Sequence, residues 1–344
     1  MLDDLKYIYE KDSQDALGIA SKQPEQLLHK FSVPTLPKKK FANIVYSGMG
    51  GSALAALLST VWPSYEVPFE ISRNYSIPGY VGKDTLFIAC SYSGNTEETL
   101  SSLAHAQKTK ATIVVIAGGG KLQEIAKAEK LPLIILPKAS QPRYAVFYNL
   151  KALIQLLNKA DLFIESITEK ELVATAEFLA TNTKSFLATV PTTKNPPKKM
   201  AQELMGKSIV VYAGPYLAPA AYKWKISFNE NAKNIAWMGQ LPEFNHNEFI
   251  GWSSHPTQKP YAVVELHSSF EHPRIKKRFE ISARLLSGKR PEAQVIEARG
   301  DTHLEQLLWT VMLGDFTSIY LGLLNGLNPT PVDLVEKFKK EMSC

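Results

Sequence analysis

A run of hydroxyl residues at positions 91–96 stands between a short apolar stretch and a helix-like segment. The apolar stretch is Leu86-Phe-Ile-Ala89, the run reads Ser-Tyr-Ser-Gly-Asn-Thr, and Glu97 and Glu98 follow it. A helix start presents unpaired backbone N–H groups and partial positive charge, and short hydroxyl side chains add donors without crowding an anion. The run therefore indicates a phosphate-binding turn between a strand and a helix. The same residues also fit a simple N-capped helix that binds nothing.

A second turn of this kind lies earlier in the chain. Apolar residues at 44–46 lead into Gly48-Met-Gly-Gly-Ser52 and then into the helix-like segment Ala53–Leu58. Two such turns on neighbouring strands would meet at the carboxyl edge of one parallel sheet. The glycine spacing is not G-x-G-x-x-G, and the lysine of a Walker A loop is missing. The pattern thus favours a small phosphorylated ligand over a dinucleotide or nucleotide.

Apolar stretches and helical patterns alternate along the whole chain, which predicts an α/β fold with parallel sheets flanked by helices on both faces. The strands expected in the first half are Ile44–Ser47, Leu86–Cys90, Ala111–Ala117 and Pro132–Leu136. Those expected in the second half lie in Ser208–Pro215, where a glycine turn follows the strand as in the first half, and at Asn234–Met238, Tyr261–Leu266 and Gln294–Ile296.

Longer helices are expected between and after these strands. They lie at 143–160, 168–188, 274–286, 303–324 and 332–342, after a helical lead-in that ends near Lys30. The polar stretch Thr189–Lys199 contains three prolines and is expected to be a linker. We therefore expect a phosphate-binding N-terminal domain at 1–150, connecting helices and a linker at 151–198, and a C-terminal domain at 199–344.

Composition sets limits on the class of protein. Hydrophobic residues make up 45% of the 344 residues and charged residues 21%, which is typical of a soluble globular protein. The net charge of +6 comes from scattered lysines, so a nucleic-acid partner is not expected. Cys90 and Cys344 lie far apart, and neither a signal pattern nor a membrane-length apolar stretch is present, which favours the cytoplasm.

Motifs in both halves resemble those of one protein family. They are Gly48-Met-Gly-Gly-Ser52, Ser91-Tyr-Ser-Gly-Asn-Thr96, Gln141-Pro-Arg143, Trp224-Lys-Ile-Ser-Phe-Asn-Glu-Asn-Ala-Lys233, Phe244-Asn-His-Asn-Glu248 and Gly314-Asp-Phe-Thr-Ser-Ile-Tyr-Leu321. Over nearly the whole chain the sequence resembles the sugar isomerase (SIS) domain proteins, and among them the bifunctional phosphoglucose/phosphomannose isomerases. S-x-S-G-N-T marks only the superfamily, whereas N-E-N-A-K followed by N-H-N-E is more specific.

The resemblance implies two SIS-type modules, each a parallel sheet flanked by helices, in a homodimer whose active site is completed across the interface. It implies an enzyme of carbohydrate metabolism that interconverts fructose 6-phosphate with glucose 6-phosphate and mannose 6-phosphate. The reaction would pass through an enediol and need neither a metal nor another cofactor. No cysteine and histidine cluster has metal-ligand spacing, which agrees with that expectation.

The resemblance also assigns roles to individual residues. The substrate phosphate would be held by Gly51, Ser52, Ser91, Ser93 and Thr96. Glu230 matches the catalytic base, and Arg143 matches the cation near the reacting carbons. His246, supplied by the partner subunit, and Lys339 match the residues that assist ring opening.

Each catalytic candidate also has a simpler interpretation. On an ideal helix, Glu230 lies opposite the apolar stripe of Ala221, Trp224 and Phe228, as a solvated acid would. His246 lies in a polar loop, where a histidine is usually just exposed. Lys339 borders an apolar stripe and could be drawn inward or extend along that stripe to solvent, and Phe338 replaces the leucine that is common before it in the family.

Arg143 follows Pro142 at a helix start, where a cation opposes the helix dipole, which suggests a purpose beyond helix stability. The alternative functions are an SIS isomerase for another phosphosugar and a phosphosugar sensor without turnover.

Overall fold

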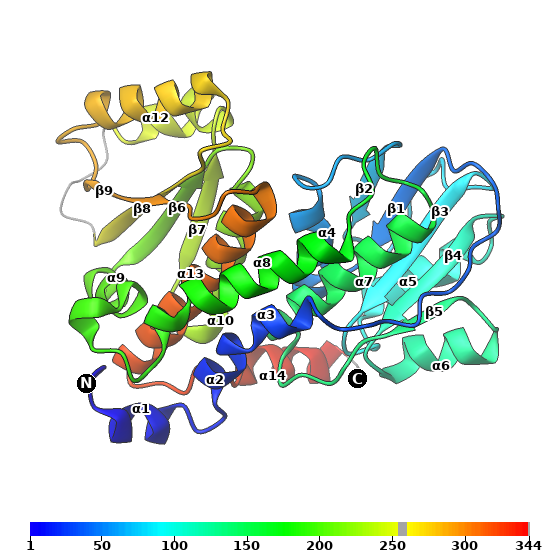
Figure 1. Cartoon of the computed structure of the whole chain (residues 1–344), viewed down its shortest axis with the longest axis horizontal. Coiled ribbons are helices and arrows are strands. Elements are labelled where there is room, and N and C mark those ends of the chain that lie inside the picture. The colour runs from blue at the N-terminus through cyan, green and yellow to red at the C-terminus, as the bar shows by residue number, and fades with distance from the viewer. Residues whose placement is uncertain (254–259, 343–344) are drawn as a thin grey trace. The chain divides into compact units, whose positions relative to one another are not determined.

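The structure, a computed structural model, describes residues 1–253 and 260–342 and divides the chain into two compact units. One unit is Lys22–Glu177, here called the N-sheet unit. The other, the C-sheet unit, joins Met1–Ser21 to the chain from Phe178 onward. Figure 1 gives the course of the chain by colour. The functional domain limits expected from the sequence stay predictions.

The N-sheet unit contains a parallel sheet of five strands in the order β2-β1-β3-β4-β5 (Figure 1). The central strand β3 is buried along its whole length, and it pairs with β1 and β4 so that Ile88 lies beside Tyr46 and Val114. The strands are β1 Asn43–Ser47, β2 Phe69–Ser72, β3 Thr85–Ser91, β4 Thr112–Ala117 and β5 Leu133–Ile135. The central position of β3 explains its unbroken apolar sequence.

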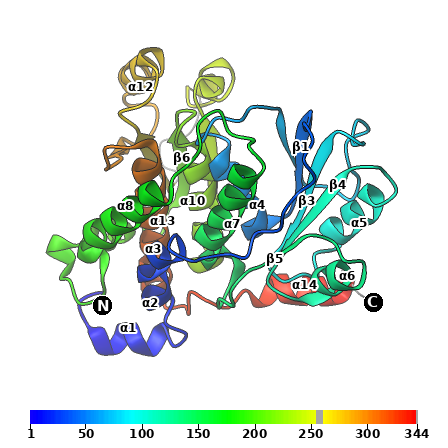
Figure 2. The ribbon, with the colours of Figure 1, turned by 45° about the vertical axis from the view of Figure 1, so that its right-hand side comes forward.

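Helices cover both faces of this sheet, as the alternation predicted (Figure 2). On one face, Val45, Phe87 and Val115 pack against Leu103 of α5 and Leu122 of α6. On the other, α4 and α7 pack against each other. The helices are α3 Gln23–Gln26, α4 Gly50–Ser59, α5 Glu97–Ala106, α6 Gly120–Ala128, the 3-10 helix η1 Pro142–Tyr144, α7 Val146–Lys159 and α8 Glu169–Asn182, which continues into the C-sheet unit.

The C-sheet unit contains a second parallel sheet, of four strands in the order β7-β6-β8-β9. Its strands are β6 Ser208–Ala213, β7 Ala236–Gln240, β8 Tyr261–His267 and β9 Ala293–Glu297. Its helices are α1 Leu5–Lys11, α2 Ala16–Ser21, η2 Lys184–Phe186, η3 Thr192–Lys194, α9 Pro196–Leu204, α10 Ala218–Asn231, η4 Glu243–His246, α11 Glu248–Gly251, α12 Pro273–Leu285, α13 His303–Leu324 and α14 Asp333–Met342. The two sheets confirm the predicted α/β class.

The long helix α13 is the core element of this unit, and α2, α9 and α10 pack against it. It begins with a capping box in which Thr302 and Glu305 bond each other's backbone N–H groups. Among the described residues, α13 is the one helix long and apolar enough to cross a bilayer, and its apolar window is entirely buried in the structure. This burial is what the core helix of a folded domain requires.

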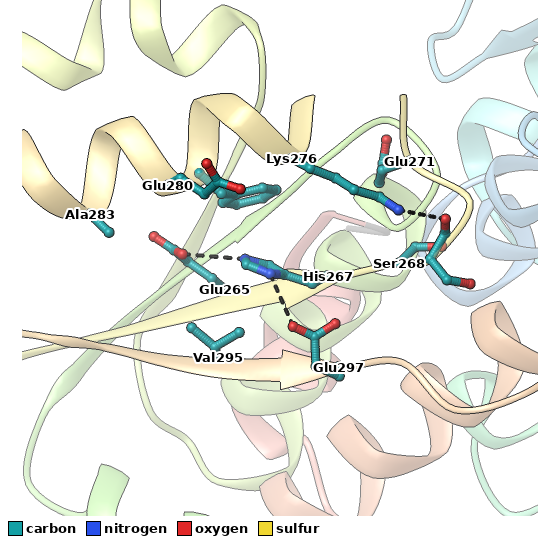
Figure 3. A pocket seen from close by; sticks show the side chains of 11 residues that line it. Glu265, His267, Ser268, Glu271, Lys276, Glu280, Ala283, Val295 and Glu297 are labelled. Carbon is teal, nitrogen blue, oxygen red and sulfur yellow. Dashed lines mark hydrogen bonds and ion pairs between the residues drawn. The ribbon is translucent and has the colours of Figure 1, made fainter. Parts of the chain in front are cut away.

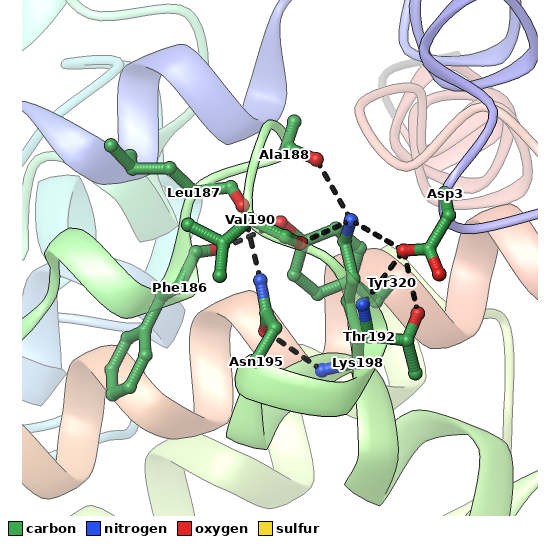
Figure 4. A network of polar contacts seen from close by, with 9 residues as sticks. All are labelled: Asp3, Phe186, Leu187, Ala188, Val190, Thr192, Asn195, Lys198 and Tyr320. Atoms are coloured by element: carbon green, nitrogen blue, oxygen red, sulfur yellow. Dashed lines mark hydrogen bonds and ion pairs between the residues drawn. The ribbon is translucent and has the colours of Figure 1, made fainter.

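The stretch Thr189–Lys199, expected to be a linker, is instead folded into the C-sheet unit. Helix α9 begins inside it at Pro196, where proline is favoured because its ring pre-sets the helical φ. The side chain of Asn195 accepts a bond from the Lys198 amide at 3.1 Å. The buried Lys198 ammonium donates to the carbonyls of Ala188 and Val190, both at 2.8 Å, and pairs with Asp3 (Figure 4). These bonds tie the N-terminal segment to the start of α9.

Candidate functional site

A hydrogen bond joins the two glycine-containing turns of the N-sheet unit, and further bonds connect hydroxyl groups within the second turn. The Ser52 hydroxyl, in the first turn of α4, accepts the backbone N–H of Tyr92 at 2.9 Å. Ser91 Oγ lies 2.8 Å from Thr96 Oγ1 and 3.4 Å from Ser93 Oγ, and it accepts the Gly94 N–H at 3.0 Å. The turns after β1 and β3 thus form one cradle, defined here as Gly51, Ser52, Ser91, Ser93 and Thr96.

The helices that start at this cradle have no side-chain caps. Helix α4 follows Met49, and α5 follows Thr96, and neither N-cap side chain bonds its own helix. The interpretation of the hydroxyls as simple caps therefore fails for Thr96, whose side chain bonds Ser91 instead. Two helix starts lined by hydroxyl groups are chemically suited to an anion with several oxygens, because backbone donors and helix dipoles both favour negative charge.

Arg143 lies directly beside the cradle. A Cβ atom on Gly51 would lie 2.9 Å from the carbonyl carbon of Pro142 and 3.1 Å from the Arg143 nitrogen, so only glycine lets α4 approach η1 this closely. The Arg143 side chain is 2% exposed, and its guanidinium lies 4.8 Å from the centre of the Tyr144 ring. The fold therefore places the backbone of a buried arginine next to Gly51, one of the residues predicted to hold a phosphate.

The corresponding turn of the second sheet is filled by a side chain of the protein itself. After β6, the Glu271 carboxylate accepts the Tyr216 N–H at 2.9 Å, next to the start of α10. A Cβ on Gly214 would lie 2.3 Å from Glu271 Oε1. Burial raises the pKa of Glu271, while backbone bonds from Tyr216 and Leu217 act in the opposite direction. The pattern of strand and glycine turn is thus repeated in the second half, but at the start of α10 the Glu271 carboxylate already occupies the place of an anion.

Glu230 lies in the last turn of α10 and is half-buried. The apolar side chains Ala221, Trp224 and Phe228 are fully buried, as expected. On the opposite side, Lys223 is 0% exposed, whereas Ile226 and Glu230 are partly exposed. The interpretation of Glu230 as a solvated acid therefore stays a prediction, although Lys223 on the same side of the helix is held inside the protein.

The other two catalytic candidates of the C-sheet unit are exposed. His246 ends η4, and Lys339 lies on α14, where its ammonium bonds Glu336 at 2.7 Å. Helix α14 buries none of its residues, and Phe338 is 65% exposed. Lys339 is thus not drawn inward, because the apolar stripe beside it packs against no core. The structure brings the cradle and Arg143 together, whereas Glu230, His246 and Lys339 lie on separate elements of the other unit.

A cavity that the sequence did not predict lies between α12 and the end of β8 in the C-sheet unit (Figure 3). Its volume is about 490 Å³. His267 Nε2 lies 3.4 Å from Glu265 Oε2, and His267 Nδ1 lies 3.3 Å from Glu297 Oε1. Burial acts to raise the pKa of Glu265, but hydrogen bonds from His267 and Arg290 outweigh it and lower that pKa. In the sequence, the pattern that could have indicated this cavity is Glu265-x-His267 at the end of an expected strand.

In residues 1–253 and 260–342, no group of three or more histidine, cysteine, aspartate or glutamate residues is arranged to hold a metal ion. The expectation of a reaction without a metal stays a prediction.

Comparisons with known proteins match most of the chain. The family described as "Bacterial phospho-glucose isomerase C-terminal SIS domain" matches residues 193–342. A bifunctional phosphoglucose/phosphomannose isomerase of Aquifex aeolicus is 32% identical over 305 residues, 88% of this chain and 91% of that protein. A D-glucosamine-6-phosphate 4-epimerase of Sulfolobus acidocaldarius is 34% identical over 217 residues, 63% of this chain and 66% of that protein.

Solved structures share the fold at lower sequence identity. A glucose-6-phosphate isomerase like protein from Thermus thermophilus superposes with a TM-score of 0.66 at 18% identity, covering 98% of each chain. This similarity confirms the expected fold of two sheet-and-helix modules.

Proposed function

Because the chain belongs to the bifunctional phosphoglucose/phosphomannose isomerase family, we propose that it is an aldose–ketose isomerase that interconverts fructose 6-phosphate with glucose 6-phosphate and mannose 6-phosphate. The observation that carries this proposal is the cradle of hydroxyl groups at two helix starts without side-chain caps, with Arg143 beside it. A dianionic phosphate on a sugar is the ligand that such a cradle suits best.

The reaction moves a proton between C1 and C2 of the open-chain sugar through an enediol. It requires one carboxylate that removes the proton and returns it, and we assign this role to Glu230. Negative charge develops on the enediolate oxygens, and the Arg143 guanidinium is the cation assigned to stabilise it. Because the guanidinium is buried, it is shielded from competing water, which strengthens its attraction for a nearby anion.

Hexose phosphates are mostly cyclic, so the ring must open before the proton moves. His246 and Lys339 are assigned to this step as the groups that exchange protons with the ring oxygen and the C1 hydroxyl. An unperturbed imidazole titrates close to neutral pH and serves as either acid or base. Both side chains are exposed in the single chain, which agrees with a site that is completed when His246 is contributed by a partner subunit.

Both epimers arise from one intermediate if the enediol rotates about the C2–C3 bond before the proton returns. The base then delivers the proton to either face of C2 without a second catalytic group.

The proposal has three further parts. The protein is a homodimer, it is located in the cytoplasm, and its own side chains alone carry out catalysis.

A second candidate function comes from the 4-epimerase of Sulfolobus acidocaldarius, whose match covers 63% of this chain. An epimerase at C4 of glucosamine 6-phosphate would leave the C2 hydrogen in place. A phosphosugar sensor would bind the sugar and convert nothing.

One assay separates these functions. Purified protein treated with a chelator is incubated with fructose 6-phosphate and, separately, with glucosamine 6-phosphate, and the sugar phosphates are resolved by anion-exchange chromatography. Glucose 6-phosphate and mannose 6-phosphate from the first substrate support the proposal. Conversion of glucosamine 6-phosphate alone supports the epimerase, and binding of fructose 6-phosphate with no product supports the sensor.

A further inference from the structure

A row of buried polar side chains joins α10 to α13 in the C-sheet unit. The Lys223 ammonium forms an ion pair with Asp315 and donates to the Ser227 hydroxyl at 2.7 Å. Ser227 donates to Asp315 Oδ1 at 2.7 Å, and all three side chains are 0% exposed. One turn further along α10, the Asn231 amide donates to Ser318 at 2.9 Å. We call Lys223, Ser227 and Asp315 the buried triad.

Helices α10 and α13 pack very closely along this row of polar side chains. A Cβ on Gly314 would lie 2.2 Å from the Trp224 ring nitrogen, and one on Gly322 would lie 2.6 Å from the Asn231 carbonyl oxygen. The Trp224 ring N–H donates to the Thr310 carbonyl at 2.7 Å. Close contact at two glycines fixes the distance between the helices, and the polar row fixes their rotation and register.

Ideal helix geometry places Lys223 and Ser227, the two triad residues of α10, on the same face of that helix as Glu230. Residues 223, 227 and 230 follow one another at intervals of four and three, so their side chains lie on one face. Glu230 stands two turns after Lys223 and directly follows the triad toward the end of the helix. A rotation of α10 about its axis would move Glu230 sideways, and it would also separate the buried charges of Lys223 and Asp315.

Buried charges are a poor means of adding stability, because desolvation offsets much of their attraction, but a misplaced pair is strongly unfavourable. An apolar contact would tolerate small rotations that this pair does not tolerate. We propose that the buried triad consists of positioning residues, which hold the last turn of α10, and with it Glu230, in one orientation. The inference rests on the proposed isomerase function.

The test replaces the ion pair by an apolar pair of similar size in the full chain, as Lys223→Met with Asp315→Leu. Both charges are removed together, so neither is left unpaired, and Ser227 can bond a carbonyl of its own helix. We expect folding to be retained, kcat for fructose 6-phosphate to fall about tenfold or more, and KM to stay within about twofold, because the proton-transfer geometry and not the binding is lost.

The matched control is Thr317→Val. Thr317 is equally buried on α13, and its hydroxyl bonds the Leu313 carbonyl of its own helix at 2.7 Å, outside the triad. Its kcat should equal that of the wild type. If the double variant folds and keeps the wild-type kcat, the positioning role is wrong and the triad only supports the fold.

A second variant covers the case in which the double variant does not fold. Ser227→Ala deletes one hydroxyl of the triad, and we expect kcat to fall about threefold at unchanged KM. An unchanged kcat in this variant overturns the inference. Absence of isomerisation in the wild type would instead overturn the proposed function, so the two failures are distinguishable.

Discussion

The backbone of Gly51 lies so close to Arg143 that a Cβ atom on residue 51 would be 3.1 Å from the Arg143 nitrogen. Gly51 belongs to the first turn of α4, whose start lines the cradle, and Arg143 is the candidate for stabilising the enediolate. One close backbone contact thus sets the distance between the start of α4 and the backbone of η1, the 3-10 helix that carries Arg143. Any side chain at position 51 has to displace either the start of α4 or the backbone of η1.

Replacing Gly51 by alanine should therefore impair both binding and turnover. We expect kcat/KM for fructose 6-phosphate to fall about tenfold, which corresponds to about 1.4 kcal/mol of transition-state stabilisation. The control is Gly79→Ala in the same unit, where a Cβ would meet no atom within 4 Å. Steady-state kinetics of both variants make the comparison, and equal losses in the two would contradict the role of the close contact.

Removing the Thr96 hydroxyl tests the cradle itself. Thr96→Val keeps the shape of the side chain but deletes the group that lies 2.8 Å from Ser91 Oγ. We expect KM for fructose 6-phosphate, and the inhibition constant of inorganic phosphate, to rise about tenfold, as for the loss of a hydrogen bond to a charged group. Ser101→Ala, on the same helix with its hydroxyl bonded to the Tyr75 carbonyl, should change neither constant. A normal phosphate inhibition constant in Thr96→Val would place the anion elsewhere.

The ion pair of Glu265 with Arg290 should make stability depend on pH. Both side chains are 4% exposed, so Glu265→Gln strands a buried cation and should lower the free energy of unfolding at pH 7 by about 3 to 5 kcal/mol. The pKa of Glu265 is lowered in the folded protein from its ordinary value of 4.5, which applies to the unfolded chain. Its contribution to stability is therefore complete above pH 4.5 and is lost as the pH falls through the lower folded pKa.

Urea unfolding of wild type and Glu265→Gln at pH 7 and near pH 3 measures this contribution. The difference between the two proteins should shrink at the lower pH. Glu280→Gln is the control, since Glu280 is 65% exposed in a surface pair with Lys277 and should change stability by about 0.5 kcal/mol or less. A difference that is the same at both pH values would contradict the assignment.

Cys90 should not react as a thiol in the folded protein. It is fully buried in β3, and burial raises its pKa to about 12, so the protonated thiol dominates at pH 8. In a Cys344→Ser background, a disulfide reagent should modify no thiol in native buffer and one thiol in denaturant. Modification at native pH 8 within minutes would show that β3 opens readily.

Much of the architecture could be predicted from the sequence, because buried parallel strands are apolar throughout. The expected strands at Leu86–Cys90 and Tyr261–Leu266 lie within one residue of β3 and β8 at each end. The edge strand β2 was missed, since Phe69-Glu-Ile-Ser72 alternates and is too polar to form an apolar run. Helix α9 was not predicted, because prolines usually interrupt a helix, although proline is favoured in the first turn of a helix.

The candidate site was predictable to the extent that its chemistry is local. The cradle residues stand in two short motifs, so the sequence could group them, and in the structure a hydrogen bond from the Tyr92 N–H to Ser52 joins the two turns. The burial of Lys223 could not be predicted. Its partner Asp315 is 92 residues away, and no local sequence pattern indicates that the two residues form a pair. The assignments of Glu230, His246 and Lys339 to the reaction stay predictions.

The most direct test of the central claim follows hydrogen at C2 by NMR. Wild type and Glu230→Gln are incubated with fructose 6-phosphate in D₂O, and Asn229→Asp, which changes the neighbouring side chain, serves as the control. We predict that the wild type forms glucose 6-phosphate and mannose 6-phosphate with deuterium at C2. Glu230→Gln should bind the substrate but form neither product and exchange no hydrogen. Products without deuterium from the wild type would contradict an enediol intermediate that exchanges with solvent, and turnover by Glu230→Gln would contradict the assignment of the base.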